Sequence, residues 1–382
     1  MDSISYREEN LKLYKEEDIL KNEVCKAKPI IITIQDTNRC NLRCFMCQRN
    51  AQRQEIKNNI YCKVSEWRFI RRVLGKMGYA ITDTVMDINL FRKIANETFP
   101  FLRYLYLTVS GEVFTNPNFS QELDIIEEYG TKLVLFSNAT LIPKGRLLSR
   151  LVKNLSELIV SFDAATKTTY EKIRKGAKYE KVIDNIRRFN ESRKGPGIGN
   201  KPKLTFRFVL MRNNIEELTK WVELVKEFEA DNIAVAHVII FNKLDEEESL
   251  LHHKQIADYH LERARKRAEE LKINIQEFPF LYSENIRIEE KDMLTNEPCA
   301  FLWREAFIEL DGSVYPCCGS IKDGLLMGNI KYHTFDEIWN GTNYQVLRRS
   351  FKMGNMLPQC KTCYHRARFT HSDNKEAYIL CR

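Results

Sequence analysis

The sequence predicts an α/β protein built around a parallel sheet. Between residues 29 and 245, short runs rich in β-branched and apolar residues alternate with stretches long enough for helices. This alternation is typical of parallel strands joined by right-handed helical crossovers. The 11 cysteines are a second observation, because they gather toward the two ends and none lies between Cys62 and Cys299. Clustered cysteines in a reducing compartment indicate metal or redox chemistry rather than disulfides.

Composition and charge narrow the class of protein. The chain has 382 residues, of which 43% are hydrophobic and 29% charged, and this suits a globular protein with a sizeable core. No apolar run reaches the roughly 18 residues of a membrane-spanning helix, and the charged N-terminus has no signal-peptide core. We therefore expect a cytoplasmic protein without a membrane partner. The net charge of +8 is spread among acidic residues and accompanies no nucleic-acid-binding motif, so we expect no nucleic-acid partner.

The first elements lead to a cysteine-rich loop. Residues 1–28 are polar and charged, and we interpret them as an N-terminal extension of helix and loop. The apolar run at 28–35 predicts a buried strand, which ends at the segment DTNRCNLRCFMC. Residues 51–80 are basic and predict partly helical structure, and residues 85–99 predict an amphipathic helix.

The alternation then continues through five more strands. Gly130 is placed to end one helix, and Gly176 is placed to break another. Six strands of this kind fit either an open sheet or a partial barrel, and periodicity does not choose between them. The predicted strands are 103–110, 132–138, 157–163, 203–210 and 232–240, and the predicted helices are 118–130, 143–155, 166–193, 215–230 and 252–272.

Beyond this region the pattern changes. Residues 246–298 predict a linking helix and strand that follow the alternating domain at 29–245. Residues 299–382 carry short strands, turns and cysteines. So short a segment buries little core, and we predict a small second domain that is held together partly by metal.

The first cysteine group lies directly after the first predicted strand. Cys40, Cys44 and Cys47 have the spacing C-x3-C-x2-C. Three thiolates on one short loop can bind a [4Fe–4S] cluster and leave its fourth iron open to a small molecule. A partial zinc site and buried structural thiols are the alternatives. Zinc prefers four ligands, and no nearby His or Cys at a usual spacing completes such a set.

The segment RCNLRCFMC resembles the signature of the radical S-adenosylmethionine (SAM) superfamily. The resemblance extends through most of the chain and implies a partial (β/α)6 barrel of the TIM type. It also implies that SAM chelates the open iron, and that one electron from a donor such as flavodoxin or ferredoxin splits SAM into methionine and a 5′-deoxyadenosyl radical. Family members often have an aromatic residue before the last cysteine. Met46 stands there in this chain, where it would help to pack around the adenine.

Two strand ends resemble further family motifs, at the positions where (β/α) barrels carry function. Ser110-Gly111-Glu112-Val113 resembles the family's Gly-Gly-Glu-Pro, with departures at its first and last residues. Glu112 would accept hydrogen bonds from the SAM amino group, and capping of the following turn is the alternative role. Ser137-Asn138-Ala139 resembles the family's Thr-Asn-Gly and places an amide in the implied pocket.

The fourth strand and the helix after it complete the implied SAM contacts. Ser161-Phe162-Asp163-Ala164 is similar to a family motif whose serine and aspartate contact the ribose or methionine end of SAM. Arg174 resembles an arginine that pairs with the SAM carboxylate, and an exposed helix arginine is the alternative. The SAM-binding residues that the resemblance implies are Met46, Gly111, Glu112, Asn138, Ser161, Asp163 and Arg174.

The second cysteine group lies near the C-terminus. From their number alone, four thiolates indicate either a tetrahedral zinc site or a fully ligated [4Fe–4S] cluster. Asp311-Gly312 predicts a hairpin turn that brings Cys317 back toward Cys299. The segment resembles the twitch or SPASM auxiliary-cluster domain of many radical SAM enzymes, which favours iron–sulfur. The implied ligands are Cys299, Cys317, Cys360 and Cys363, with Cys318 as the alternative to Cys317.

The remaining cysteines have no partner at a usual spacing. Cys25, Cys62 and Cys381 are therefore interpreted as buried or surface thiols. A full SPASM domain carries several cysteines after its C-x2-C pair and holds two clusters. Only Cys381 follows that pair here, so the pattern matches the shorter twitch form with one auxiliary [4Fe–4S] cluster.

The resemblance leads to three hypotheses about function. The first is a radical oxidoreductase that removes hydrogen from a small polar metabolite of the aminocyclitol or sugar type and passes one electron to the auxiliary cluster. The second is a radical enzyme that epimerises or crosslinks a ribosomal peptide. The third is a non-catalytic protein in which metal only stabilises the fold. Beyond the cluster loop no catalytic residue stands out, because Tyr, Arg and Lys are numerous at 61–79 and 205–212.

Overall fold

The computed structural model describes residues 3–49, 84–195, 198–199, 201–239, 247–250, 253–279, 299–321 and 324–361. The helical structure predicted within 51–80 lies outside the described residues, as do Cys62, Cys363 and Cys381. No helix within the described ranges is long and apolar enough to cross a lipid bilayer.

The described strands form one sheet of ten, in the order β10-β9-β8-β1-β2-β3-β4-β5-β6-β7. From β8 through β7 every neighbouring pair is parallel, whereas β9 and β10 run antiparallel to their neighbours. The strands are β1 (Ile31–Ile34), β2 (Tyr104–Leu107), β3 (Lys132–Ser137), β4 (Leu155–Ser161), β5 (Lys203–Leu210), β6 (Asn232–His237), β7 (Asn274–Glu277), β8 (Glu305–Ile308), β9 (Ser313–Tyr315) and β10 (Gly328–Asn329).

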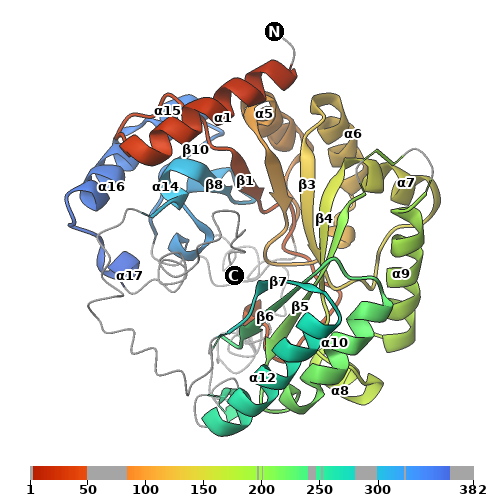
Figure 1. The fold of residues 1–382 in the computed structure, drawn as a ribbon. Coiled ribbons are helices and arrows are strands. Elements are labelled where there is room, and N and C mark those ends of the chain that lie inside the picture. The colour runs from red at the N-terminus through yellow and green to blue at the C-terminus, as the bar shows by residue number, and fades with distance from the viewer. Residues whose placement is uncertain are drawn as a thin grey trace, which may run out of the picture.

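Helices follow the strands and cover the outer side of the curved sheet, as Figure 1 shows for α5, α6, α7 and α9. Amphipathic crossovers place their apolar faces on the sheet, which produces this layering. The helices are α1 (Ser3–Leu20), α5 (Ile88–Thr98), α6 (Phe119–Tyr129), α7 (Gly145–Asn154), α8 (Lys167–Ile173), α9 (Tyr179–Ser192), α10 (Leu218–Glu227), α12 (Lys254–Glu270), α14 (Phe301–Arg304), α15 (Phe335–Trp339), α16 (Thr342–Lys352) and α17 (Pro358–Lys361).

Alternate strand residues face opposite sides of the sheet. On β5, Phe206 and Phe208 face the helices and contact Phe228 and Trp221. The residues between them point to the concave side. The core between sheet and helices is apolar and fully buried, so the concave side is the face on which polar side chains can gather.

The predicted alternation is confirmed. β1 to β6 form a parallel series with helical crossovers, as expected for a partial barrel. Gly130 ends α6 in the left-handed conformation, with φ of 61°. The helical region at 166–193 breaks near Gly176 into α8 and α9. The segment 246–298 supplies α12 and β7, and β7 extends the sheet through pairing with β6.

The N-terminal extension packs against the C-terminal region. The indole of Trp339, on α15, donates to the carbonyl of Ala27 at 2.9 Å. The buried guanidinium of Arg348, on α16, donates to the carbonyl of Glu23 and stacks on Trp339. Cys25 is buried here, and its N–H donates to the side chain of Asn340. The N-terminal extension and the region of α15 and α16 therefore stabilise each other.

Candidate functional site

The loop that carries the first cysteine group begins just after β1. Backbone hydrogen bonds fix it to two other segments. The N–H of Arg43 donates to the carbonyl of Lys175, just beyond α8, and the N–H of Phe45 donates to that of Ile173, the last residue of α8. The Arg39 carbonyl accepts the N–H of Glu112, which follows β2. The protein's own backbone therefore holds the loop on both sides.

The three cysteines of this loop lie within electrostatic reach of one another. Burial raises the pKa of Cys44 to about 12, and the thiolates of Cys47 and Cys40 add to this shift. An iron that binds here must replace that proton. No three metal-binding side chains of the described residues converge on one point. A cubane does not require this, because each cysteine binds a different iron.

Glu112 is fully buried beside the cysteine loop. Its carboxylate accepts a hydrogen bond from the Ser137 hydroxyl and one from the Asn138 N–H, each at 2.7 Å. Burial raises the pKa of Glu112 to about 7, although these hydrogen bonds oppose the rise. Its side chain makes no cap hydrogen bond to the following 3₁₀ turn, η2 (Val113–Thr115), but the N–H of Phe114 in that turn lies near enough to lower its pKa, so both roles stay predictions.

Gly111 lies against the cysteine loop at a distance that excludes a side chain. A Cβ at this position would lie 2.7 Å from the Arg39 carbonyl oxygen and 3.0 Å from that of Thr37. Real Cβ atoms do not approach backbone oxygens so closely. The close approach of two backbone segments explains glycine here.

Asn138 connects the end of β3 to the cysteine loop. Its amide nitrogen lies 3.1 Å from the Asn41 side-chain oxygen and 4.0 Å from the Cys40 sulfur. Its oxygen accepts the N–H and the hydroxyl of Thr140. The predicted amide is therefore at the site, and it contacts a cluster-loop sulfur.

Asp163 and Arg174 form a buried ion pair. The Asp163 carboxylate lies 2.5 Å from a terminal nitrogen of Arg174, and the two side chains are 0% and 6% exposed. The other terminal nitrogen of Arg174 lies 3.7 Å from the Cys44 sulfur. The alternative of an exposed helix arginine is therefore wrong, because Arg174 caps the end of α8 with its side chain turned inward.

Ser161 and Met46 are also buried at this end of the sheet. Ser161 is the last residue of β4 and pairs in register with Arg207 of β5. Met46 belongs to the apolar core. Contacts of the predicted SAM-binding residues with SAM itself stay predictions.

Two groups of site residues were not predicted from the sequence. The Gln35 side chain accepts the N–H groups of Val109 and Ser110 and donates to the Ser110 carbonyl at 3.0 Å, which fixes the segment that leads to Glu112. Asp36 and Glu122 are both fully buried, and the Asn116 amide donates to each of them, at 2.8 and 2.9 Å. The position of Gln35 directly after the apolar strand was the signal that could have marked it.

The described cysteines of the second group are Cys299, Cys317, Cys318 and Cys360, all partly buried and none in a disulfide. The predicted hairpin is confirmed, because β8 and β9 pair antiparallel around Gly312. Cys299 precedes β8 and Cys317 follows β9. Both therefore lie beyond the end of the sheet at which β1 begins, whereas Cys40 lies beyond the end at which β1 finishes.

The residues fit the groups that the resemblance implies. The first loop supplies three thiols, and among the described residues no fourth His or Cys completes a protein-only set for one ion. One position of a cluster would then stay open to a small molecule. Buried polar groups at Glu112, Asn138 and Asp163 surround this loop, which suits a ligand that carries amino and carboxylate groups.

Comparisons with known proteins agree with this site. The family model described as "Radical SAM superfamily" matches residues 34–225. The model described as "SPASM: Iron-sulfur cluster-binding domain" matches residues 299–364, which begin at Cys299 and include Cys363. These domains carry a [4Fe–4S] cluster that works with SAM and an auxiliary iron–sulfur cluster. No curated protein matches the chain.

Solved structures share the fold at low sequence identity. Streptococcus suis SuiB bound to S-adenosylmethionine is 15% identical, with a TM-score of 0.60 over 88% of this chain and 71% of that one. Native anSMEcpe with bound AdoMet is 16% identical, with a TM-score of 0.57 over 92% of this chain and 94% of that one. Together with the family model that covers residues 34–225, half of the protein, these findings show that the chain belongs to the radical SAM superfamily.

Proposed function

We propose that this radical SAM enzyme is an oxidoreductase that acts on a small polar metabolite. The observation that carries the proposal is the group of polar side chains on the concave face of β4 to β7, where Ile159 is an apolar exception. On the other side of the same strands, the side chains that face the helices are apolar. A binding surface for an apolar substrate would not need buried amides and charges, which are costly to desolvate without partners.

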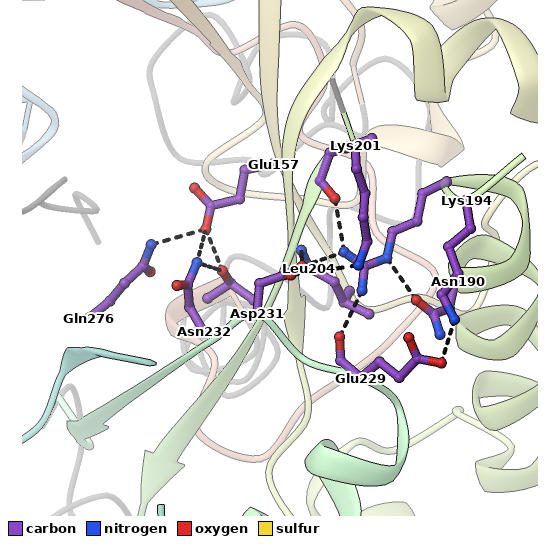
Figure 2. A network of polar contacts seen from close by, with 12 residues as sticks. Glu157, Asn190, Lys194, Lys201, Leu204, Glu229, Asp231, Asn232 and Gln276 are labelled. Atoms are coloured by element: carbon purple, nitrogen blue, oxygen red, sulfur yellow. Dashed lines mark hydrogen bonds and ion pairs between the residues drawn. The ribbon is translucent and has the colours of Figure 1, made fainter. Parts of the chain in front are cut away.

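The deeper part of this concave face is a hydrogen-bonded network. One oxygen of Glu157 accepts hydrogen bonds from the Thr205 hydroxyl, from Gln276 at 3.1 Å and from Asn232 at 3.4 Å. Asn232 also accepts a hydrogen bond from Asn274 at 2.7 Å. Figure 2 shows Glu157 of β4, Asn232 of β6 and Gln276 of β7 pointing toward one another. The network gives the face fixed polar groups that need no rearrangement to bind a ligand.

Nearer to Ser161, the concave face carries a pair of opposite charges. A terminal nitrogen of Arg207 lies 3.7 Å from a carboxylate oxygen of Glu277, and the two side chains are 5% and 18% exposed. Ala234 of β6 pairs in register with both residues, so only a methyl group occupies the strand between them. A substrate with amino and hydroxyl groups can bind the carboxylate and the guanidinium at the same time. A substrate without these groups gains neither contact and binds more weakly.

The bound clusters and SAM supply the one-electron chemistry that breaks an unactivated C–H bond. The protein's own residues bind and orient. Arg207 and Glu277 hold the polar substituents, and Glu157 with its donors keeps the deeper face rigid. The buried strand ends around Ser161 and Asp163 exclude water, which protects a reactive species from side reactions.

A second candidate function is the modification of a peptide. SuiB has been solved bound to the precursor peptide SuiA, at 14% identity and a TM-score of 0.58. Native anSMEcpe has been solved with AdoMet and Kp18Cys peptide, at 16% identity and a TM-score of 0.57. Sequence identity this low shows a shared fold and not a shared substrate. Peptides are therefore tested beside small metabolites as the competing class of substrate.

The test uses anaerobically reconstituted protein with SAM and dithionite, incubated in parallel with a panel of aminocyclitols and amino sugars and with a panel of short peptides. We expect members of the first panel to raise 5′-deoxyadenosine formation above the substrate-free rate and to yield a product that lacks two hydrogen atoms. Arg207→Gln should raise KM about tenfold or more, the loss of one charge-assisted contact, whereas the exposed Lys203→Gln on the same strand should not. Stimulation by peptides alone would overturn the proposal and establish the second candidate.

A further inference from the structure

The guanidinium of Arg174 contacts two groups at the site. One terminal nitrogen lies 3.7 Å from the sulfur of Cys44, and the other lies 2.5 Å from the carboxylate of Asp163. All three side chains are buried, and Cys44 is 7% exposed. At 3.7 Å a nitrogen donor and a sulfur acceptor are within hydrogen-bond reach. The charge of Arg174 therefore acts on this sulfur in a medium that screens it weakly.

The backbone places Arg174 opposite Cys44. The N–H of Arg43 donates to the Lys175 carbonyl at 2.9 Å, and the N–H of Phe45 donates to the Ile173 carbonyl at 2.8 Å. These two hydrogen bonds join the neighbours of Cys44 to the neighbours of Arg174, in opposite order. These two backbone hydrogen bonds thus hold Cys44 and Arg174 next to each other, which favours the contact between their side chains.

Asp163 is itself fixed, so it can hold the guanidinium in one orientation. Its second carboxylate oxygen accepts the N–H of Val209 at 2.9 Å, and its carbonyl accepts the Asn214 amide at 3.0 Å. The planar fork of arginine can contact a carboxylate and a sulfur at once, which the single ammonium of a lysine cannot do in the same geometry.

We propose that Arg174 is a positioning residue for the radical-generating cluster. Its guanidinium donates a hydrogen bond to the Cys44 sulfur and thereby raises the reduction potential of the cluster. Adding an electron makes the cluster more negative, and a cation beside a ligating sulfur stabilises that reduced state. Hydrogen bonds to cluster sulfurs are known to tune potentials in this way. The inference depends on the family assignment and is independent of the substrate.

The experiment is a redox titration of the full chain without SAM, followed by EPR. The signal of the first cluster is isolated by subtraction of the Cys40/Cys44/Cys47→Ala variant. At the potential that half-reduces the wild-type cluster, we expect Arg174→Gln to lower the ratio of reduced to oxidised cluster about tenfold, the size of one charge-assisted hydrogen bond. That ratio corresponds to about 59 mV for one electron. The control is Arg150→Gln, which removes an equal charge from a surface ion pair and should leave the potential unchanged.

A wild-type potential in Arg174→Gln, together with weakened SAM binding, would overturn the proposal and make Arg174 a ligand of SAM alone. If the glutamine variant loses its iron, Arg174→Lys is titrated instead. Lysine keeps the charge but lacks the planar fork. A reduction potential that lies below that of wild type, by less than the value of about 59 mV expected for the glutamine variant, supports the proposal. A wild-type potential in Arg174→Lys would count against it.

Discussion

Asp36 and Glu122 face a common donor, the amide of Asn116, in a fully buried space behind the end of β1. Burial raises the pKa of each carboxyl, and for Glu122 the charge of Asp36 raises it further. Two carboxylates at one buried donor cannot both ionise at low cost, so the pair retains a proton where exposed carboxyls have lost theirs. Cys40, the first cysteine of the cluster loop, lies four residues after Asp36 in the sequence.

Replacement of Glu122 by glutamine should stabilise the protein at alkaline pH. A carboxyl whose folded pKa is raised favours the folded state at low pH, and this contribution is lost as pH rises from the unfolded pKa, near 4.5, through the folded value. Glu122→Gln removes that dependence. We expect its midpoint of thermal unfolding to exceed that of wild type at pH 8 and to approach it at pH 5. Glu128→Gln, an exposed change on the same helix, should show no such difference, and equal behaviour of the two variants would contradict the shared-proton interpretation.

Gly111→Ala should loosen the cysteine loop. The new Cβ would meet the carbonyl oxygens of Arg39 and Thr37, which are backbone atoms and cannot rotate away. We expect the iron content of the first cluster to fall by about half or more, because a displacement of about 1 Å at a site can cost most of its function. Gly199→Ala meets nothing within 4 Å and serves as the control. Full iron content in Gly111→Ala would show that the loop tolerates the shift.

Asp231→Asn should weaken the base of the barrel without changing the chemistry. The fully buried Arg193 pairs with Asp231 and donates to the carbonyls of Glu229 and Pro202, part of the contacts drawn in Figure 2. Loss of the carboxylate charge leaves a buried cation less well compensated, at a cost of about 1–2 kcal/mol. Urea unfolding should move to lower concentration while SAM cleavage stays at the wild-type rate. Glu229→Gln, which alters a mostly exposed pair with Lys194, should change the midpoint little.

Cys360→Ala should remove the auxiliary cluster and leave the first one. Reconstituted wild type is expected to hold about eight irons and the variant about four, because each [4Fe–4S] cluster holds four. Cleavage of SAM under dithionite should survive in the variant, whereas turnover to an oxidised product should fail. Cys25→Ala is the matched control, since Cys25 is a buried cysteine outside the predicted ligand set whose N–H donates to Asn340, and it should leave the iron content unchanged. An unaltered iron content in Cys360→Ala would remove Cys360 from the ligand set.

The order of the elements was predictable because strands and helices alternate with clear periodicity. Their ends were less so. β4 begins at Leu155, two residues before the predicted start, because α7 passes into it at Asn154 without a turn residue to mark the change. Tertiary pairing with β3 and β5 decides that boundary.

The candidate site was predictable where spacing along the chain carries it, as for Cys40, Cys44 and Cys47. Polar residues whose role depends on distant partners were not. Nothing near Asp36 in the sequence reveals that Glu122, on helix α6, lies beside it. Arg174 could equally have been exposed on the sequence alone, and only the backbone hydrogen bonds at Ile173 and Lys175 turn it inward.

The parallel pairing of β8 with β1 has a consequence for electron flow. Cys40 lies beyond one end of these paired strands and Cys299 and Cys317 lie beyond the other, and four residues of strand span roughly 13 Å. The pairing of β1 with β8 therefore fixes the separation of Cys40 from Cys299 and Cys317 through a rigid sheet rather than through a flexible segment. Rates of electron tunnelling fall steeply with distance. The pairing of these strands would therefore set the rate of electron transfer between clusters bound by the two cysteine groups.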